Sequence, residues 1–284
     1  MQQVTTIAEL RAALALERKM GRRVALVPTM GALHDGHLAL VDDARSRADV
    51  VVMSLFVNPL QFRPGEDFER YPRPMEADRK LAEARGVDVL FAPTVAEMYP
   101  ADREIRIEAG ETASLWEGAA RPGHFEGVLT VVAKLFNIVQ PEVTCFGQKD
   151  IQQVTLIRQL IAQLDFPVEL SVVPTVREVD GLALSSRNAY LTVADRQAAV
   201  ALSRALQAAV TRWEAGERAA ASLHRAAMKV LDGTTGVVTD YVAVVDGNRM
   251  MPVDRAERGT VIALAARVGS TRLIDNVILG QRGE

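Results

Sequence analysis

Short runs of apolar, often β-branched residues recur along the first part of the chain, and longer amphipathic stretches separate them. The runs are continuously hydrophobic instead of alternating between apolar and polar positions. Strands of this kind are buried on both faces, as in a parallel sheet covered by helices on both sides. We therefore expect an α/β fold, a doubly wound, Rossmann-like parallel sheet with strands at 24–27, 50–56, 87–91, 142–146 and 168–173.

Apolar periodicity between these strands predicts helices over 37–47, 75–85, 125–139 and 151–164. The helix over 125–139 is apolar almost all round, with Phe125, Leu129, Val132 and Phe136 among its large residues. A helix without a polar face is buried, either in a core or partly at a subunit interface.

The texture changes after Leu191, where two alanine-rich helices are expected over 193–214 and 218–231. Three strand-like segments follow at 238–245, 260–266 and 271–279. Helices followed by strands favour a smaller α+β domain. We predict a Rossmann-like domain over 1–175 that binds the ligands, and an α+β lid domain over 176–284.

Composition excludes several classes of protein. The net charge is −3 and no clustered basic excess is present, so we expect no nucleic-acid partner. Cys145 is the single cysteine, which rules out an intrachain disulfide and favours a reducing, cytoplasmic location. The N-terminus does not read as a signal peptide and no long apolar run occurs, so no membrane partner is expected.

The first strand leads into a loop that carries His34 and His37 beside Gly31 and Gly36. The glycines allow the backbone to approach a ligand, and the helix that follows offers unpaired N–H groups to a phosphate. Histidines three residues apart face the same ligand from one helical turn, and each can hydrogen-bond a phosphate oxygen near neutral pH.

Two plainer interpretations compete for these histidines. Without a nearby cysteine or a third histidine they form a poor zinc site, and isolated histidines are usually structural. The loop matches neither the dinucleotide-binding fingerprint nor a P-loop. Its His-x-Gly-His spacing resembles the nucleotidyltransferase-like superfamily, which implies an enzyme that forms adenylates or transfers nucleotides.

Longer motifs in consecutive order resemble the pantothenate synthetase (pantoate–β-alanine ligase) family. They lie at 28–37, 56–62, 65–73, 121–125, 130–141, 147–150 and 184–188. The resemblance implies that (R)-pantoate and ATP give a pantoyl adenylate and pyrophosphate, and that the amine of β-alanine then displaces AMP. It also implies Mg²⁺ with the ATP, for which we assign no protein ligands, and a homodimer.

The resemblance assigns catalytic roles to His34, His37, Lys149 and Arg187, with the family's proton donor at His37. The segment 185–188 stands where class I synthetases carry a mobile phosphate-binding loop. Position 148 is glutamine where many relatives carry glutamate, so we expect only its backbone to take part. The residues expected at ATP are Met30, Gly31, Ala32, Leu33, His34, Asp35, Gly36, His37, Gly147, Gln148, Lys149, Asp150, Val176, Leu184, Ser185, Ser186 and Arg187.

For pantoate, the resemblance points to Gln61 and Gln153, whose neutral amides orient a hydroxy acid without opposing its attack on phosphate. The segment 62–74 reads as a gate over the site. Asn58, Tyr71, Arg121 and His124 are expected to line or cover the same cavity. The apolar wall for the geminal methyl groups is expected from Pro28, Met30, Val128 and Val132.

Two other functions remain open from the sequence. A nucleotidyltransferase of the same superfamily would need more arginine and lysine facing a phosphate-bearing second substrate. A regulatory module that only binds ATP would need the phosphate loop, but would have no use for the two histidines together with the Ser-Ser-Arg segment. A nucleotide-turnover assay separates this module from both enzymes.

Overall fold

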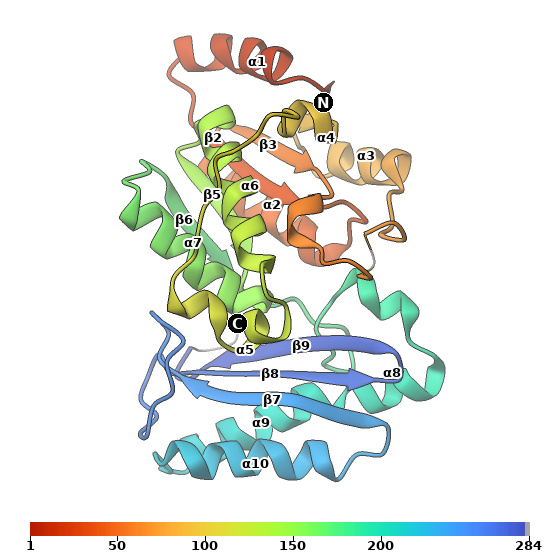
Figure 1. The fold of residues 1–284 in the computed structure, drawn as a ribbon, viewed down its shortest axis with the longest axis vertical. Helices are drawn as coiled ribbons and strands as arrows, with labels where there is room; N and C mark the ends of the chain where they lie inside the picture. The colour runs from red at the N-terminus through yellow and green to blue at the C-terminus, as the bar shows by residue number, and fades with distance from the viewer. Residues whose placement is uncertain (67, 282–284) are drawn as a thin grey trace. The chain divides into compact units, whose positions relative to one another are not determined.

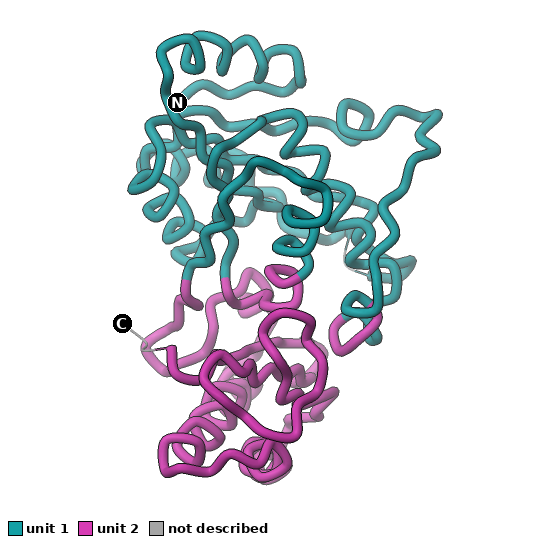
Figure 2. Tube along the Cα trace, turned by 90° about the vertical axis from the view of Figure 1, so that its left-hand side faces the viewer, with its two compact units in different colours: residues 1–113, 118–147, 156–173 teal, residues 114–117, 148–155, 174–284 magenta. Residues whose placement is uncertain are grey.

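The computed structural model describes residues 1–66 and 68–281. The chain splits into two compact units, drawn in separate colours in Figure 2. Unit 1 comprises 1–113, 118–147 and 156–173, and unit 2 comprises 114–117, 148–155 and 174–284. Two short segments from the first part of the chain thus belong to the second unit.

Unit 1 is built on a six-stranded sheet in the order β1-β4-β3-β2-β5-β6, and every neighbouring pair is parallel (Figure 1). The predicted doubly wound α/β domain is therefore confirmed. The strands are β1 Gln2–Val4, β2 Val24–Thr29, β3 Val50–Leu55, β4 Val89–Phe91, β5 Val143–Gly147 and β6 Glu169–Val173.

The strand order reverses at β2, which pairs with β3 on one side and with β5 on the other. The chain runs outward from β2 through β3 to β4, and later from β5 to β6. In open parallel sheets, ligands bind outside the carboxyl ends of the strands at such a switch point. The segments that leave β2 and β3 therefore stand where this fold binds ligands.

Both faces of the parallel sheet are buried. Ala25 and Val27 of β2 belong to one apolar cluster with Val41 of the helix after β2, whereas Leu26 points to the opposite face and is equally buried. The helices of the first part of the chain, some of which cross the boundary between units, are α1 Ile7–Lys19, α2 Asp35–Arg47, α3 Met75–Ala84, α4 Val95–Met98, α5 Trp116–Ala120, α6 His124–Val139 and α7 Ile151–Gln163. Short 3₁₀ helices are η1 Pro59–Gln61, η2 Glu111–Ser114 and η3 Gln148–Asp150.

The apolar helix α6 is buried within its own chain. Phe125, Leu129, Val132 and Phe136 are at most 5% exposed. A single copy of the chain thus accounts for the apolar surface of α6, and this helix gives no separate evidence for a subunit interface.

Unit 2 contains a three-stranded antiparallel sheet in the order β7-β8-β9. Helices α9 and α10 pack on one face of it, over a core that includes Leu202, Leu223 and Leu264 (Figure 1). This arrangement confirms the predicted α+β character of the C-terminal part. The elements are η4 Ser186–Tyr190, α8 Val193–Ala199, α9 Ala201–Glu214, α10 Ala220–Asp232, β7 Val237–Val245, β8 Val261–Val268 and β9 Thr271–Ile278.

The prediction of a single helix over 193–214 is wrong. The segment 193–214 forms two helices, α8 and α9, which meet at Val200. Val200 has φ −61° and ψ −18°, closer to 3₁₀ than to α geometry. Its carbonyl also accepts a hydrogen bond from the Ser203 hydroxyl at 3.0 Å, which competes with the helical ladder.

Among the described residues, no helix is long and apolar enough to cross a membrane.

Candidate active site

The loop between β2 and α2 is closed by its two histidines. Helix α2 begins at Asp35, two positions before the predicted start, and His34 is its N-cap. The Nδ1 atom of His34 accepts the Gly36 N–H at 3.2 Å, and Nδ1 of His37 accepts the His34 N–H at 3.3 Å. The rings stack with centroids 4.1 Å apart. The pair therefore forms a reciprocal capping box made of imidazoles.

This geometry fixes the tautomer of both neutral rings. A ring nitrogen that accepts an N–H cannot itself carry a proton, so Nδ1 is bare and Nε2 carries the hydrogen. His34 and His37 thus each carry their hydrogen on Nε2, at the N-terminus of a helix whose dipole favours an anion.

Asp78 of α3 holds the loop between β2 and α2 in place. Its Oδ2 and Oδ1 atoms accept the backbone N–H groups of Ala32 and Leu33, both at 2.8 Å, and its side chain is buried. Gly31 and Ala32 adopt left-handed backbone conformations with φ of 86° and 52°. A Cβ atom on Gly31 would lie 2.9 Å from Oδ2 of Asp78, so glycine is required there.

Sequence reasoning missed Asp78. An aspartate in the first turn of a helix is common because it complements the helix dipole, and this bland explanation fits Asp78 equally well. Its distance of 46 residues from Ala32 leaves no local pattern that could reveal the contact.

Asn58 organises the segment that follows β3. It is 1% exposed, and its Nδ2 donates to Oε1 of Gln61 and to the carbonyl of Gly127, both at 3.0 Å. Its Oδ1 accepts the hydroxyl of Tyr99 at 2.8 Å and the Leu60 N–H at 3.2 Å. With four partners of its own, Asn58 holds η1 in place, and with it the amide of Gln61.

Gln61 joins this segment to the loop between β2 and α2. Its Nε2 donates to the sulfur of Met30 at 3.0 Å. A thioether is a weak acceptor, so this amide hydrogen can change to a stronger partner at small cost. Gly127 of α6 permits the close approach, because a Cβ there would lie 2.3 Å from the carbonyl oxygen of Leu60.

Arg121 and His124 converge on the backbone of the same residue. Nδ1 of His124 lies 2.9 Å from the carbonyl oxygen of Gln61, and Arg121 donates to that oxygen at 3.2 Å. A carbonyl only accepts, so His124 carries its hydrogen on Nδ1, and its Nε2 accepts from Arg121 at 3.1 Å. Arg121 also pairs with Glu66 at 2.6 Å. Both residues thus brace η1 and the predicted gate.

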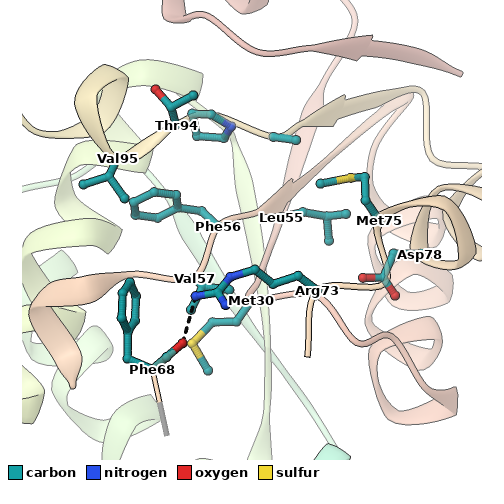
Figure 3. Close-up of a pocket in the computed structure, with 13 residues that line it drawn as sticks. Met30, Leu55, Phe56, Val57, Phe68, Arg73, Met75, Asp78, Thr94 and Val95 are labelled. Carbon is teal, nitrogen blue, oxygen red and sulfur yellow. Dashed lines mark hydrogen bonds between the residues drawn. The ribbon is translucent and has the colours of Figure 1, made fainter. Parts of the chain in front are cut away.

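The predicted gate 62–74 lies within the described residues apart from residue 67. Phe62 packs edge-on against Phe68 and Tyr71, with centroids 5.4 and 5.9 Å apart. A cavity of about 240 Å³ lies beside this segment. Its lining includes Met30, Phe56, Phe68, Arg73 and Asp78, which Figure 3 labels. Arg73 spans it and donates to the carbonyl of Phe68 at 2.8 Å.

In unit 2, the predicted nucleotide residues Gln148, Lys149 and Asp150 form the 3₁₀ turn η3. The ammonium of Lys149 lies 3.8 Å from the carboxylate of Asp150. The side chain of Gln148 donates to Oδ1 of Asn276 at 3.2 Å, a role that sequence reasoning did not assign. Gly147, directly before the turn, ends β5 in unit 1.

Gln152 and Gln153 differ although they are adjacent. Gln152 is 5% exposed. Its Oε1 accepts the Glu117 N–H at 3.0 Å, and its Nε2 donates to the Leu115 carbonyl at 2.9 Å. Gln153, the predicted pantoate contact, is only half-buried. Of the two amides, Gln152 is the structural one.

The other predicted nucleotide residues of unit 2 follow a short hairpin. Leu184 donates its N–H to Val176 at 3.0 Å, and the Oγ of Ser185 accepts the Arg187 N–H at 3.3 Å as the N-cap of η4. Asn188 ties this loop to the hairpin, because its Nδ2 donates to Glu178 at 2.9 Å and to the carbonyl of Ala183 at 3.1 Å. The segment with the two serines and Arg187 is thus anchored at both ends.

Cys145 is fully buried in β5 and donates to the carboxylate of Asp43 at 3.4 Å. Burial and the negative charge of Asp43 raise the pKa of the thiol, which disfavours the reactive thiolate form. Within residues 1–66 and 68–281, no group of three or more His, Cys, Asp or Glu side chains could hold a metal ion.

Comparisons with known proteins agree on one family. A family model described as Pantoate-beta-alanine ligase matches residues 2–278. The chain is 50% identical to a pantothenate synthetase of Moorella thermoacetica over 279 residues, which cover 98% of this chain and 99% of that protein.

Two solved structures extend this similarity. A pantothenate synthetase from Thermus thermophilus has a TM-score of 0.93 and 49% identity, covering 98% of this chain and 99% of the other. A pantoate-beta-alanine ligase from Francisella tularensis, complexed with Beta-gamma ATP and Beta-alanine, has a TM-score of 0.81 and 35% identity, covering 98% and 97%.

Proposed function

This chain belongs to the pantoate–β-alanine ligase family, and from that premise we propose that it is an ATP-dependent ligase that condenses (R)-pantoate with β-alanine. The ligase from Francisella tularensis forms a complex with an ATP form and β-alanine, which supports both as substrates here. The products are pantothenate, AMP and pyrophosphate.

The reaction proceeds in two displacements. A carboxylate oxygen of pantoate attacks the α-phosphorus of ATP, and the bond from that phosphorus to the bridging oxygen breaks to release pyrophosphate. The amine of β-alanine then attacks the acyl carbon, loses a proton, and the carbon–oxygen bond to AMP breaks. No covalent bond to the enzyme is needed, so the protein contributes position and charge stabilisation.

One observation carries the proposal: the reciprocal cap of His34 and His37 at the start of α2. It places two Nε2–H groups at the N-terminus of a helix, whose dipole favours an anion, in the segment that follows the central strand β2. Such donors stabilise negative charge that builds up on phosphate oxygens during displacement. In this arrangement His37 acts as a hydrogen-bond donor, and to become a full imidazolium it would have to release the His34 N–H.

We assign the remaining nucleotide contacts to Gly147, at the end of β5, and to residues of unit 2. Lys149 supplies a mobile point charge, and Arg187 with Ser185 and Ser186 supplies a fork of donors for the outer phosphates and the departing pyrophosphate. The anchoring of the loop by Asn188 supports this assignment. Backbone of Gly147, Gln148, Asp150, Val176 and Leu184 completes the proposed nucleotide site.

For pantoate we propose Gln61 and Gln153 as the polar contacts. The weak Met30 sulfur on the amide of Gln61 and the half-burial of Gln153 support this assignment. Asn58, Arg121 and His124 act mainly by holding η1, and Tyr71 by closing the aromatic cluster of the gate. Pro28, Met30, Val128 and Val132 remain the proposed apolar wall.

We propose that Mg²⁺ enters with ATP. The described residues offer no cluster of three carboxylate, imidazole or thiolate ligands, which fits a cation held mostly by phosphate oxygens and water. When bound, Mg²⁺ neutralises charge that builds up on the phosphates.

A homodimer and a cytoplasmic location are further proposals. The dimer rests on membership of the family alone, because α6 is buried within one chain. Sedimentation equilibrium at micromolar concentration tests it, and a monomer alone would reject it. The single, buried cysteine supports a reducing compartment.

Pantoate-dependent exchange of labelled pyrophosphate into ATP tests the proposed activity. We expect exchange only when pantoate is present, and amide formation only after β-alanine is added. Exchange that requires a phosphate-bearing acceptor instead of pantoate would favour a nucleotidyltransferase. Binding of ATP without turnover under any of these conditions would favour a regulatory module.

A further inference from the structure

A single buried asparagine on β9 holds the turn that carries Lys149. Asn276 is 1% exposed, and its Nδ2 donates to the carbonyl oxygens of Gln148 and Lys149, both at 2.9 Å. Its Oδ1 accepts the side-chain N–H of Gln148 at 3.2 Å. All of these residues belong to unit 2. The side-chain amide of Asn276 thus makes three hydrogen bonds to Gln148 and Lys149, two consecutive residues of η3.

The residue before it fixes Asn276 in turn. Oδ1 of Asp275 accepts the Asn276 N–H at 2.8 Å, and its carboxylate makes a two-pronged pair with Arg177 at 2.6 and 2.9 Å. Asp275 is 2% exposed. Arg177 pairs across the hairpin with Ala183, one residue before Leu184. The same short piece of β9 therefore contacts η3 and the hairpin that leads to Ser185.

These contacts concern the backbone of Lys149, not its ammonium group. A lysine side chain has a flexible four-carbon stem, and the reach of its charge is set by where its backbone is held. The 3₁₀ turn has few hydrogen bonds of its own, so outside partners decide its position. An amide that donates to two successive carbonyls fixes both the position and the direction of the peptide between them.

We propose that Asn276 is a positioning residue for adenylation, which acts by holding η3 so that Lys149 meets the phosphates of ATP. This inference rests on the proposed function and adds a buried residue that acts through η3. It predicts that loss of Asn276 slows the step that releases pyrophosphate, because Lys149 is then no longer held in position.

The test compares Asn276→Ala with wild type in two assays. Pantoate-dependent pyrophosphate exchange reports adenylation, and amide formation from synthetic pantoyl adenylate with β-alanine reports the second step alone. Misplacing a catalytic group by about 1 Å costs roughly a hundredfold. We expect exchange to fall by about tenfold to a hundredfold and amide formation to change by less than about threefold.

A double-mutant cycle with Lys149→Ala asks whether Asn276 acts through the lysine. If it does, the double variant is no slower in exchange than Lys149→Ala alone, because the group to be positioned is already missing. Fold losses that multiply in the double variant, or equal losses in both assays, would overturn the inference and leave Asn276 as a residue that only stabilises the fold.

Two further variants keep the result clear. Thr271→Val changes another buried polar residue of β9, five positions away, and should leave both assays unchanged. If Asn276→Ala does not fold, Gln148→Ala removes the second side-chain link between η3 and β9, and a selective loss of exchange is still expected. No selective loss there would equally overturn the inference. Wild-type protein without any pantoate-dependent exchange would reject the proposed function, and this inference with it.

Discussion

The buried carboxylate of Asp78 accepts the backbone N–H of Ala32 at 2.8 Å, between a helix and a loop that lie 46 residues apart in the chain. Ala32 has a left-handed backbone, with φ of 52°, that costs energy in any residue with a side chain. Because the other oxygen of Asp78 takes the N–H of Leu33, the two bonds hold the loop in a shape that it would not keep alone.

Asp78→Asn tests this support. The amide keeps the size of the carboxylate but offers one acceptor, and its NH₂ group would face a backbone N–H. We expect a loss of about 1–3 kcal/mol in the free energy of unfolding, measured by urea denaturation. We also expect pyrophosphate exchange to fall by about tenfold or more, because the cap of His34 and His37 follows this loop directly.

Glu76→Gln is the matched control. Glu76 lies on the same helix α3 and pairs with Arg79 on the surface, where such pairs contribute little. If Asp78→Asn behaved like Glu76→Gln in both stability and exchange, the loop would not depend on Asp78.

His37→Ala should fold and lose most of its adenylation activity. Removing one preorganised donor to a developing charge costs about a hundredfold to a thousandfold in rate. A loss of about 0.5–2 kcal/mol in stability is also expected, because His37 Nδ1 accepts the His34 N–H. Single-turnover formation of the acyl adenylate measures the first effect, and His224→Ala, in α10, is the control. Adenylation within about threefold of wild type would remove His37 from the mechanism.

Gln61→Ala and Gln153→Ala should weaken pantoate binding and spare ATP binding. An unsatisfied partner on the substrate costs about 1–3 kcal/mol, or roughly tenfold to a hundredfold in affinity. Calorimetric titration of each ligand into each variant measures this. Gln152→Ala is the contrasting neighbour, and it should lower thermal stability because its amide joins α7 to Leu115 and Glu117. Equal losses of ATP and pantoate affinity would show that Gln61 and Gln153 do not select the acid.

The ion pair of Glu66 and Arg121 predicts a dependence of stability on pH. Partial burial by itself would raise the pKa of Glu66, but the hydrogen bonds and charge of Arg121 outweigh it and lower that pKa below its usual 4.5. A carboxyl with a depressed pKa in the folded state adds stability above the unfolded value, and this contribution is lost as the pH falls through the folded value.

Urea denaturation of wild type and Glu66→Gln across this range measures the effect. We expect wild type to be more stable by up to about 1 kcal/mol at neutral pH. The stability difference should shrink as the pH falls below about 4.5, because Glu66 then takes up a proton. A difference that stays constant across the acid range would mean that the pair does not stabilise the fold.

Several features follow from the sequence because they depend on local pattern. Continuous apolar runs such as 50–56 predict a buried parallel strand, since burial on both faces leaves no polar position. The spacing of His34 and His37 after a strand predicts a phosphate loop, because both residues belong to one turn of chain. The family motifs then indicated which reaction the loop serves.

Tertiary structure alone decided which polar residue supports that loop and which one holds the turn that carries Lys149. Asp78 and Asn276 look like an ordinary helix-start aspartate and an ordinary strand asparagine, and their partners lie 46 and 127 or more residues away. Gln152 and Gln153 have the same side chain at adjacent positions, yet only burial separates the structural amide from the candidate for substrate. Hydrogen bonds between distant segments depend on where the whole backbone is placed, and this placement follows from packing instead of from any local period.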